Sequence, residues 1–325
     1  MSAICKVRSI LDDSFINNLP LTEVFVDSIT CPKNISKVVL ELNLLFPLPE
    51  LIHLKRVKSK EVLLFPSQNI VKEEVHKILQ ERGFPIDLLK NEIRKVEVAA
   101  VPPLVRSQYL QCHSIWPCNF HSDKYIEKLY TNTLFSDEEL KIKMKFMNIT
   151  EDIGKFSKNN NGVLIVDPKS NSVVAVGYDR SNDGPCRHAV MVAIDNVSKS
   201  QRGGCWTNDE YFTVDQCNSN CKDIPSDILA LLRGKYTDIK FSDSALIPSE
   251  RVTPYLCTGY DVFSTREPCI MCAMALIHSR AKRVFYGKSS ENGGLGTLCK
   301  IHTVKNLNHH YEVFIVENIE EKKDS

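Results

Sequence analysis

The sequence lacks a membrane-spanning segment, a signal peptide and a large net charge. None of its segments has ~18 uninterrupted apolar residues, so no membrane span is expected. The first six residues lack the apolar core of a signal peptide, and we therefore expect an intracellular protein. The formal net charge is only +1, from 41 basic and 40 acidic residues. Because the molecule is not a polycation, any binding of nucleic acid has to come from local basic patches.

What is present is enough for two domains with real cores. Apolar residues make up 43% of the 325 residues, and a chain of this length is typical of two domains. The chain has 12 cysteines, which in a secreted protein would predict disulfides. Without a secretion signal, we expect reduced thiols together with a cysteine pair that binds a metal.

One residue is missing from an otherwise complete pattern for a zinc-dependent deaminase. Residues 186–190 read C-R-H-A-V, and residues 267–272 read E-P-C-I-M-C. Together they make H-x-V…P-C-x-x-C, where working zinc deaminases have H-x-E…P-C-x-x-C. Three candidate zinc ligands are present: His188, Cys269 and Cys272. Val190 occupies the position of the glutamate.

Each part of this pattern has a chemical role. One imidazole and two thiolates give zinc three protein ligands and leave a fourth position open for water. Zinc lowers the pKa of that water, and the glutamate of a working deaminase carries protons to the base and to the leaving amine. A valine side chain cannot carry a proton. The sequence therefore predicts a chain that binds Zn²⁺ and has no catalytic residue at Val190.

The surroundings of the cysteines favour zinc over a redox pair or two core cysteines. Residues 260–265 read as a strand before the motif, 273–277 as a helix after it, and 282–287 as a second strand. His188 likewise opens an apolar helical run. Glu267 is the carboxylate nearest to the cysteines in sequence, but a side chain before this proline need not face the metal. A substitute acid at Glu267 is therefore the weaker alternative.

With these motifs, the chain resembles the cytidine/tRNA-adenosine deaminase superfamily over residues 161–177, 188–195 and 260–287. Val190 in place of glutamate makes it similar to the non-catalytic subunits of the eukaryotic heterodimeric tRNA wobble-adenosine deaminase. That resemblance implies a heterodimer with a catalytic deaminase subunit and binding of tRNA whose wobble adenosine becomes inosine. It also implies a location in the nucleus and the cytoplasm. Asp179 stands where such deaminases often have the asparagine that touches the nucleoside, a second departure from a working site.

Two functions of other classes stay open beside a non-catalytic subunit. The chain could be an autonomous zinc-dependent deaminase that uses a different general acid or base. It could also be a zinc-stabilised interaction module outside RNA editing. Turnover of tRNA by the purified chain, and co-purification of a second deaminase-like chain, would separate the three.

The expected elements divide the chain near residue 100. Strands are expected at 23–28, 61–65 and 94–100, with helices at about 36–46 and 71–82 between them. This order suggests a small α/β sandwich, for which a ferredoxin-like arrangement is one candidate. For the rest, the resemblance implies a cytidine deaminase-like three-layer α/β/α core. We therefore expect an N-terminal α/β RNA-binding domain at 1–100, a connector at 101–134, and a deaminase-like domain at 135–325 with an insertion at about 197–257.

One basic run is the candidate contact for RNA. Residues 55–60 read K-R-V-K-S-K beside a predicted strand. Lys and Arg side chains gain sequence-independent affinity by neutralising phosphates and releasing counterions. We predict RNA contacts by the four cations of this run: Lys55, Arg56, Lys58 and Lys60. A solvated basic loop explains the run equally well. A second cluster after the cysteine helix, Arg280-Lys282-Arg283, is at least as well explained by charges at a helix C-terminus.

Overall fold

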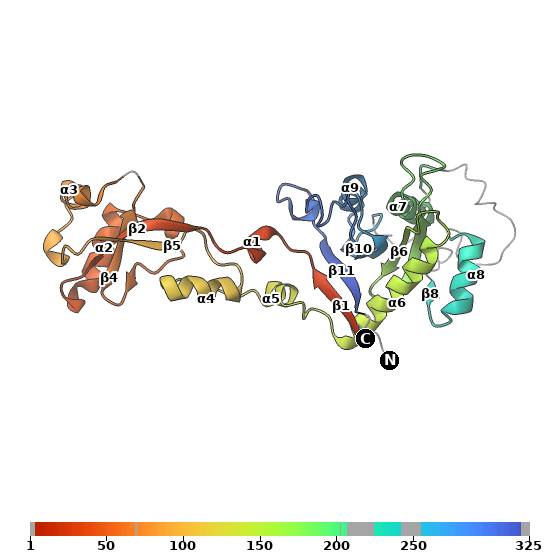
Figure 1. Cartoon of the computed structure of the whole chain (residues 1–325), viewed down its shortest axis with the longest axis horizontal. Helices are drawn as coiled ribbons and strands as arrows, with labels where there is room; N and C mark the ends of the chain where they lie inside the picture. Colours follow the sequence, from red (N-terminus) through yellow and green to blue (C-terminus); the bar gives the residue numbers. More distant parts are fainter. Residues whose placement is uncertain (1–3, 69, 202, 207–223, 242–254, 320–325) are drawn as a thin grey trace, which may run out of the picture. The chain divides into compact units, whose positions relative to one another are not determined.

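The computed structural model describes residues 4–319 except 69, 202, 207–223 and 242–254 (Figure 1). The chain forms two compact units. The smaller is Asp13–Thr131, and the larger combines Met1–Asp12 with Asn132–Ser325. The structure thus places the first boundary at residue 12 and the second at residue 131, rather than near residues 100 and 134.

The smaller unit is built on a four-stranded antiparallel sheet with the order β3-β4-β2-β5. Its strands are β2 (Leu21–Ser28), β3 (Val57–Lys58), β4 (Glu61–Pro66) and β5 (Arg94–Ala99). The helix α2 (Ile35–Leu45) connects β2 to β3, and α3 (Val75–Glu81) connects β4 to β5. Counted along the chain, this is β-α-β-β-α-β, the ferredoxin-like arrangement. The two-residue strand β3 lies inside the basic run and has no signal of its own in the sequence.

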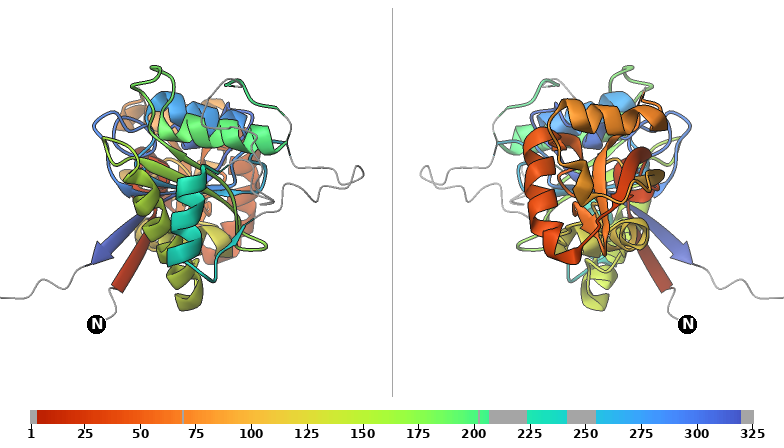
Figure 2. Two further views of the ribbon diagram at one scale, coloured as in Figure 1. Left: turned by 90° about the vertical axis from the view of Figure 1, so that its right-hand side faces the viewer. Right: turned by 90° about the vertical axis from the view of Figure 1, so that its left-hand side faces the viewer.

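Both faces of this sheet are covered. On one face, Phe25, Val62 and Leu64 pack with α2 and α3 in a buried cluster. Figure 2 shows these two helices beside the strands of the sheet. On the other face, the alternate residues Val26 and Leu63 pack with the segment that follows α4 (Arg106–Ile115), including a tryptophan that is 1% exposed. The residues after the last strand therefore form part of this unit, because they close the second face of its sheet.

The larger unit is built on a seven-stranded mixed sheet with the order β1-β11-β10-β9-β6-β7-β8. The central strands β9, β10 and β11 are parallel neighbours, and β6 runs antiparallel to both β7 and β9. Its strands are β1 (Ile4–Ser9), β6 (Gly162–Asp167), β7 (Ser172–Tyr178), β8 (Lys240–Phe241), β9 (Asp261–Arg266), β10 (Arg283–Lys288) and β11 (Glu312–Ile319).

Alternate residues of the central strands face two different helix layers. Val262, Val284 and Val313 lie in the cluster with α7 (Ala189–Ser200) and α9 (Ile270–His278). Their neighbours carry stacked rings on the opposite face, with centroids 4.7 and 5.0 Å apart, beneath α6 (Asp137–Gly154): Phe263, Phe285 and Phe314. The predicted three-layer α/β/α core is thereby confirmed (Figure 1).

A buried group of three charges fixes α6 to the sheet. Asp261 accepts hydrogen bonds from Arg283 Nε at 2.8 Å and from Lys143 Nζ at 2.9 Å. Both Asp261 and Lys143 are buried, so the ionic groups satisfy one another away from water. Arg283 is therefore committed to the core, although its sequence neighbours suggested a surface cluster.

The remaining elements are short. Three more α-helices are described: α1 (Asp13–Ile16), α5 (Lys124–Tyr130) and α8 (Ser226–Lys235). In the described part of the chain, 3₁₀ turns lie at Pro32–Asn34, Pro49–Leu51, Lys72–Glu74, Ile86–Leu88 and Ile301–Thr303. Among the described residues, no helix combines the length and the apolar character needed to cross a membrane. Of the expected insertion at 197–257, residues 207–223 and 242–254 lie outside the described residues.

Candidate metal centre

Two helix N-termini bring the three predicted ligands together. His188 is the N-cap residue of α7, and Cys269 is the N-cap residue of α9, so Cys272 lies in the first turn of the same helix. Helices α7 and α9 are in contact on one face of the large sheet. Close approach to the sheet requires Gly177 on β7, because a Cβ there would lie 2.5 Å from the carbonyl oxygen of Ala189. Local helix geometry and one glycine therefore position the site.

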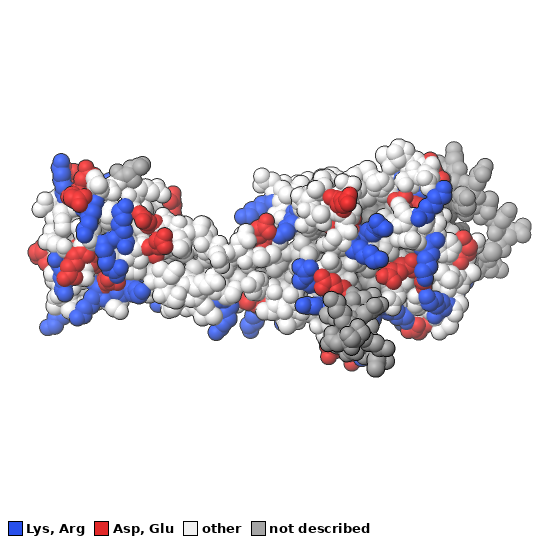
Figure 3. All heavy atoms as spheres, in the orientation of Figure 1, with Lys and Arg blue, Asp and Glu red and all other residues white. Residues whose placement is uncertain are grey.

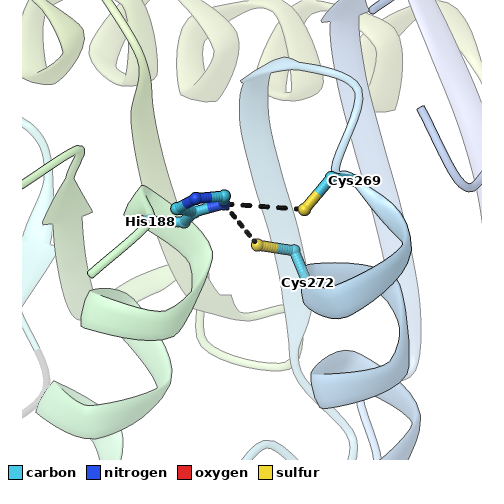
Figure 4. A group of neighbouring side chains, drawn as sticks. All are labelled: His188, Cys269 and Cys272. Atoms are coloured by element: carbon cyan, nitrogen blue, oxygen red, sulfur yellow. Dashed lines mark hydrogen bonds between the residues drawn. The ribbon is translucent and has the colours of Figure 1, made fainter. Parts of the chain in front are cut away.

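The ligand atoms have the spacing that zinc requires (Figure 4). His188 Nδ1 lies 3.5 Å from Cys269 Sγ and 3.6 Å from Cys272 Sγ, and the three ligand atoms lie within 4.8 Å of one another. A tetrahedral zinc with ordinary bonds to nitrogen and sulfur places those atoms about 3.6 Å apart. The donor set and its spacing therefore fit a zinc ion without rearrangement.

The two thiols differ in their affinity for protons. The hydrogen bond from Cys272 lowers the pKa of Cys269 to about 5, with a further contribution from His188. The same hydrogen bond and burial raise the pKa of Cys272. A metal cation that binds here replaces the thiol protons, because ligating thiols are deprotonated.

Val190 lies where the proton carrier of a working deaminase would be. It is the second residue of α7, it is 3% exposed, and it lines a cavity of about 260 Å³ together with the three ligands. Asp179 also lines this cavity, but its Oδ1 accepts hydrogen bonds from the backbone N–H of Ser181 at 3.1 Å and from the Ser181 hydroxyl at 2.6 Å. The wall nearest the ligands is therefore apolar at the position where catalysis needs a carboxylate.

Glu267 also lines this cavity, but its carboxylate is engaged by the neighbouring loop. Its buried carboxylate accepts hydrogen bonds from the backbone N–H of Leu295 at 2.9 Å, of Thr297 at 3.0 Å and of Ser290 at 3.3 Å. A Cβ at Gly293 would lie 2.1 Å from the Glu267 carboxyl carbon, so the loop closes tightly around it. Glu267 therefore fastens the 290–297 loop beside the cavity. This role was not visible in the sequence, since it depends on a loop more than twenty residues away.

The four cations of the predicted RNA run have different surroundings. The guanidinium of Arg56 donates to the carbonyl oxygens of Leu63 and Leu64, both at 2.7 Å, and burial lowers its pKa to about 10. Lys58 is half-buried, whereas Lys55 and Lys60 are exposed. The structure therefore brings the run to one hairpin, but it commits the Arg56 side chain to holding that hairpin together.

The second basic cluster is also divided by the fold. Arg280 lies just after α9 with φ of 61°, and its guanidinium lies 5.4 Å from the ring centre of Tyr255. Lys282 is exposed, and Arg283 lies in the buried ion group. The favourable interaction of cations with a helix C-terminus is enough to explain the presence of Arg280 and Lys282 here.

The search of curated proteins found relatives that are named as tRNA-specific adenosine deaminases or as inactive proteins like them. No family model matches the chain. A Danio rerio protein named "Probable inactive tRNA-specific adenosine deaminase-like protein 3" is 33% identical over 95% of this chain and 90% of its own length. The Homo sapiens protein of the same name is 31% identical over 94% and 87%, respectively. The "tRNA-specific adenosine deaminase TAD3" of Arabidopsis thaliana is 27% identical over 91% of both chains.

The chain was also compared with solved structures. One of them, from "Biochemical and Structural Studies of A-to-I Editing by tRNA:A34 Deaminases at the Wobble Position of Transfer RNA", aligns with 53% of this chain and 98% of that chain. Its sequence identity is 17% and its TM-score is 0.32.

Proposed function

The chain belongs to the family of the inactive tRNA-specific adenosine deaminase-like protein 3 and TAD3, and from that premise we propose a function. It is a zinc-binding, catalytically incompetent subunit of a tRNA adenosine deaminase. It forms a heterodimer with a catalytic deaminase subunit and helps to bind the tRNA whose wobble adenosine the complex converts to inosine. It acts in the nucleus and the cytoplasm, as the family resemblance implies.

The observation that carries this proposal is a complete ligand set beside an apolar side chain. His188, Cys269 and Cys272 have the spacing of zinc ligands, while Val190 is buried against the same cavity. A bound zinc ion would supply a cross-link between α7 and α9. Structural zinc contributes directly to folding, because the ligands converge only in the folded chain. The residues of this chain hold the metal and the loop around it, and the proton transfers belong to the partner.

The outward side of α9 supports docking of the catalytic subunit. Ile270 is 46% exposed and Met271 38% exposed at the start of the helix. Leu298, 59% exposed, follows a loop that packs against this helix start, where a Cβ on Gly294 would lie 3.0 Å from the Ile270 Cα. Adjoining exposed apolar side chains are typical of protein–protein interfaces. We assign this surface to the catalytic partner, since relatives of the chain are named as subunits.

The experiment is co-expression with the catalytic deaminase subunit of the same organism. Zinc is measured by metal analysis, assembly by native mass spectrometry, and inosine by single-turnover assays on a tRNA transcript. We expect one zinc in this chain and a one-to-one complex, with turnover only in the complex. Cys272→Ser should lose that zinc and prevent assembly. The matched control Cys257→Ser, at a buried cysteine outside the ligand set, should keep both.

Three results would contradict the proposal. Zinc-free, well-folded wild-type protein would mean that the site has decayed. Robust inosine formation by this chain alone would favour an autonomous deaminase. A stable zinc protein that never associates with a deaminase subunit would favour an interaction module outside RNA editing.

A further inference from the structure

The sheet of the smaller unit has no open face for RNA. In many RNA-binding domains with four-stranded sheets, aromatic side chains on an open sheet face stack with bases. Here α2 and α3 cover one face, and Cys112 and Trp116 lie on the other, 4% and 1% exposed. Nucleotides therefore cannot reach the sheet. Any base that stacks on this unit has to use the outer side of the covering segment.

That covering segment carries partly exposed aromatic rings at the border of its buried cluster. The rings of Tyr109 on α4 and Phe120 beyond it are stacked, with centroids 5.1 Å apart and planes 16° apart. Both side chains are only half-buried. The exposed ring of His113, one turn further along α4, lies 5.1 Å from Tyr109. A π-face at the surface accepts any base, because every base has a π-face of its own.

The basic hairpin is joined to the same segment by hydrogen bonds. The backbone N–H of Lys55 donates to the carbonyl oxygen of Pro117 at 2.9 Å, and Trp116 Nε1 donates to the carbonyl oxygen of Lys55 at 2.7 Å. Lys58 Nζ donates to the carbonyl oxygen of Ile115 at 2.6 Å. Lys55 and Lys58 are thereby fixed next to the stretch that connects Tyr109 to Phe120. Cations beside stacking rings are the usual composition of a surface that binds single strands.

Carboxylates are absent from the basic hairpin segment and from the covering segment. Residues 51–60 and 98–122 contain no Asp or Glu, in a chain that has 40 of them. Of the carboxylates that border these stretches, Glu61 pairs with Arg94, and Asp123 accepts hydrogen bonds from two backbone N–H groups at the start of α5. In Figure 3 the middle of α4 shows no acidic atoms on the face in view. Within the two stretches a phosphate would thus meet cations and no carboxylate.

We propose that these residues form an aromatic platform that binds an unpaired nucleotide of RNA. Its rings are those of Tyr109, His113 and Phe120, and its cations are Lys55 and Lys58. The base stacks on the paired rings, and the lysines neutralise the adjoining phosphates. This inference rests on the proposed function, because it specifies how the smaller unit contacts tRNA. It assigns contact with RNA to the segment that the sequence suggested was a connector.

The test uses the full chain in complex with its catalytic partner. Tyr109→Leu and Phe120→Leu keep an apolar side chain and remove the π-face. Binding is measured by fluorescence anisotropy with a tRNA transcript and with a short oligoadenylate, each over a range of salt. Loss of one stacked base is expected to raise Kd about five- to hundred-fold, with the salt slope unchanged. Lys55→Ala should instead lower the salt slope by about one.

Tyr125→Leu is the matched control, since Tyr125 is 46% exposed in the same unit but lies outside the platform. It should leave both probes bound as in the wild type. Circular dichroism and thermal unfolding of each variant exclude loss of folding as the cause.

The possible results separate this inference from the proposed function. If wild-type tRNA binding is intact and neither Leu variant changes it, the platform is overturned while the proposed function stands. If the Leu variants impair assembly with the partner and not RNA binding, the surface is a protein interface, which also overturns the platform. If the wild-type complex binds no tRNA, the proposed function itself fails.

Discussion

At the scale of single residues, Val190 determines what the metal centre can do. The ligands can hold a metal, and the cavity of about 260 Å³ has room for a small polar group. The side chain that would have to move a proton is apolar and buried, and the nearest alternative, Glu267, is bound to its own loop. We therefore propose that chemistry at this centre fails at proton transfer and not at metal binding.

Val190→Glu restores a carboxylate at the right spacing, and we expect it to produce little or no activity in the isolated chain. Loss of a general acid or base typically costs ~10²–10⁴ in rate, but productive binding needs the whole site in place. Asp179 adds a second negative charge to the same cavity. In the complex, the variant should change inosine formation only slightly, whereas loss of the partner's glutamate should end it. Single-turnover assays measure both, and strong activity of the isolated variant would contradict the expectation.

The roles of the basic residues are a second matter at this scale. The candidate His and Cys ligands could be predicted from the sequence, because their spacing is local to two helix starts. The four cations of residues 55–60 look alike in the sequence, and only the hairpin separates them. Arg56 points back to the carbonyl oxygens of its own strands, while Lys60 is exposed. The sequence pattern does not indicate which of these cations is buried, since that depends on how β3 pairs with β4.

Arg56→Ala should therefore destabilise the protein, and Lys60→Ala should not. Removal of the guanidinium takes two hydrogen bonds from the part-buried carbonyl oxygens of Leu63 and Leu64, at a cost of about 1–3 kcal/mol. Lys60 is a surface cation, and its loss should change stability by less than about 0.5 kcal/mol. Chemical unfolding of the full chain, followed by fluorescence, compares the two. Equal stability of both variants would show that the Arg56 hydrogen bonds do not contribute to the free energy of unfolding.

At the scale of elements, α8 is a helix that the sequence did not indicate. It lies within the expected insertion, where residues on both sides are outside the described part. Its end is attached to α6, because Asp152 accepts hydrogen bonds from Lys235 and from the Tyr236 hydroxyl, the latter at 2.7 Å. The long helix α6 begins with a capping box, Ser136 with Glu139, which is a signal carried by neighbouring residues in the sequence. A cap is a local signal, whereas the anchor of α8 joins residues about eighty positions apart.

Asp152→Asn should loosen α8 and should do so in a pH-dependent way. Burial alone would raise the pKa of this carboxyl, but hydrogen bonds from Lys155, Lys235 and Tyr236 lower it to about 2. A carboxyl with a depressed pKa in the folded protein contributes stability above its unfolded pKa, and this contribution is lost as the pH falls from about 4 to 2. Because the lysines are partly exposed, we expect a loss of about 1–2 kcal/mol at neutral pH.

Hydrogen exchange of α8 and unfolding of the full chain at several pH values measure this effect. The difference between the wild type and Asp152→Asn should vanish near pH 2. Lys145 pairs with Asp238 at an exposed position, and Asp238→Asn is the control that should have little effect. A difference that does not depend on pH would contradict the role of the charge.

At the scale of the whole molecule, the two ends of the described chain meet in one sheet. β1 pairs antiparallel with β11, from Ile4 opposite Ile319 to Ser9 opposite Phe314. The smaller unit is thus inserted between β1 and the rest of the larger unit. The sequence predicted the strands and helices around the cysteines, because their periodicities are local, and the family resemblance implied the three core layers. It could not indicate this pairing, since no local pattern marks partners about three hundred residues apart.

The insertion predicts that the smaller unit can be replaced without loss of the larger one. The chain leaves the larger unit at Asp12 and returns at Asn132, and the backbone N–H of Ser9 donates to Asn132 Oδ1 at 2.9 Å. A short Gly/Ser linker in place of residues 13–131 can therefore span the gap. We expect this variant to fold, to bind zinc and to assemble with the partner, and to bind tRNA more weakly with a smaller salt slope.

Deletion of residues 1–131 is the informative comparison. It removes the same unit and also β1. Without β1, the edge of β11 is exposed, and the buried side chain of Val7 is lost from the core. An unpaired edge strand promotes aggregation, so this variant should be less stable and less soluble than the linker variant. Thermal unfolding and size-exclusion chromatography compare the two, and metal analysis checks the centre in each. If the linker variant keeps the tRNA affinity and salt slope of the wild type, the smaller unit has no part in binding RNA. If both variants are equally stable, β1 is dispensable to the sheet that carries the metal centre.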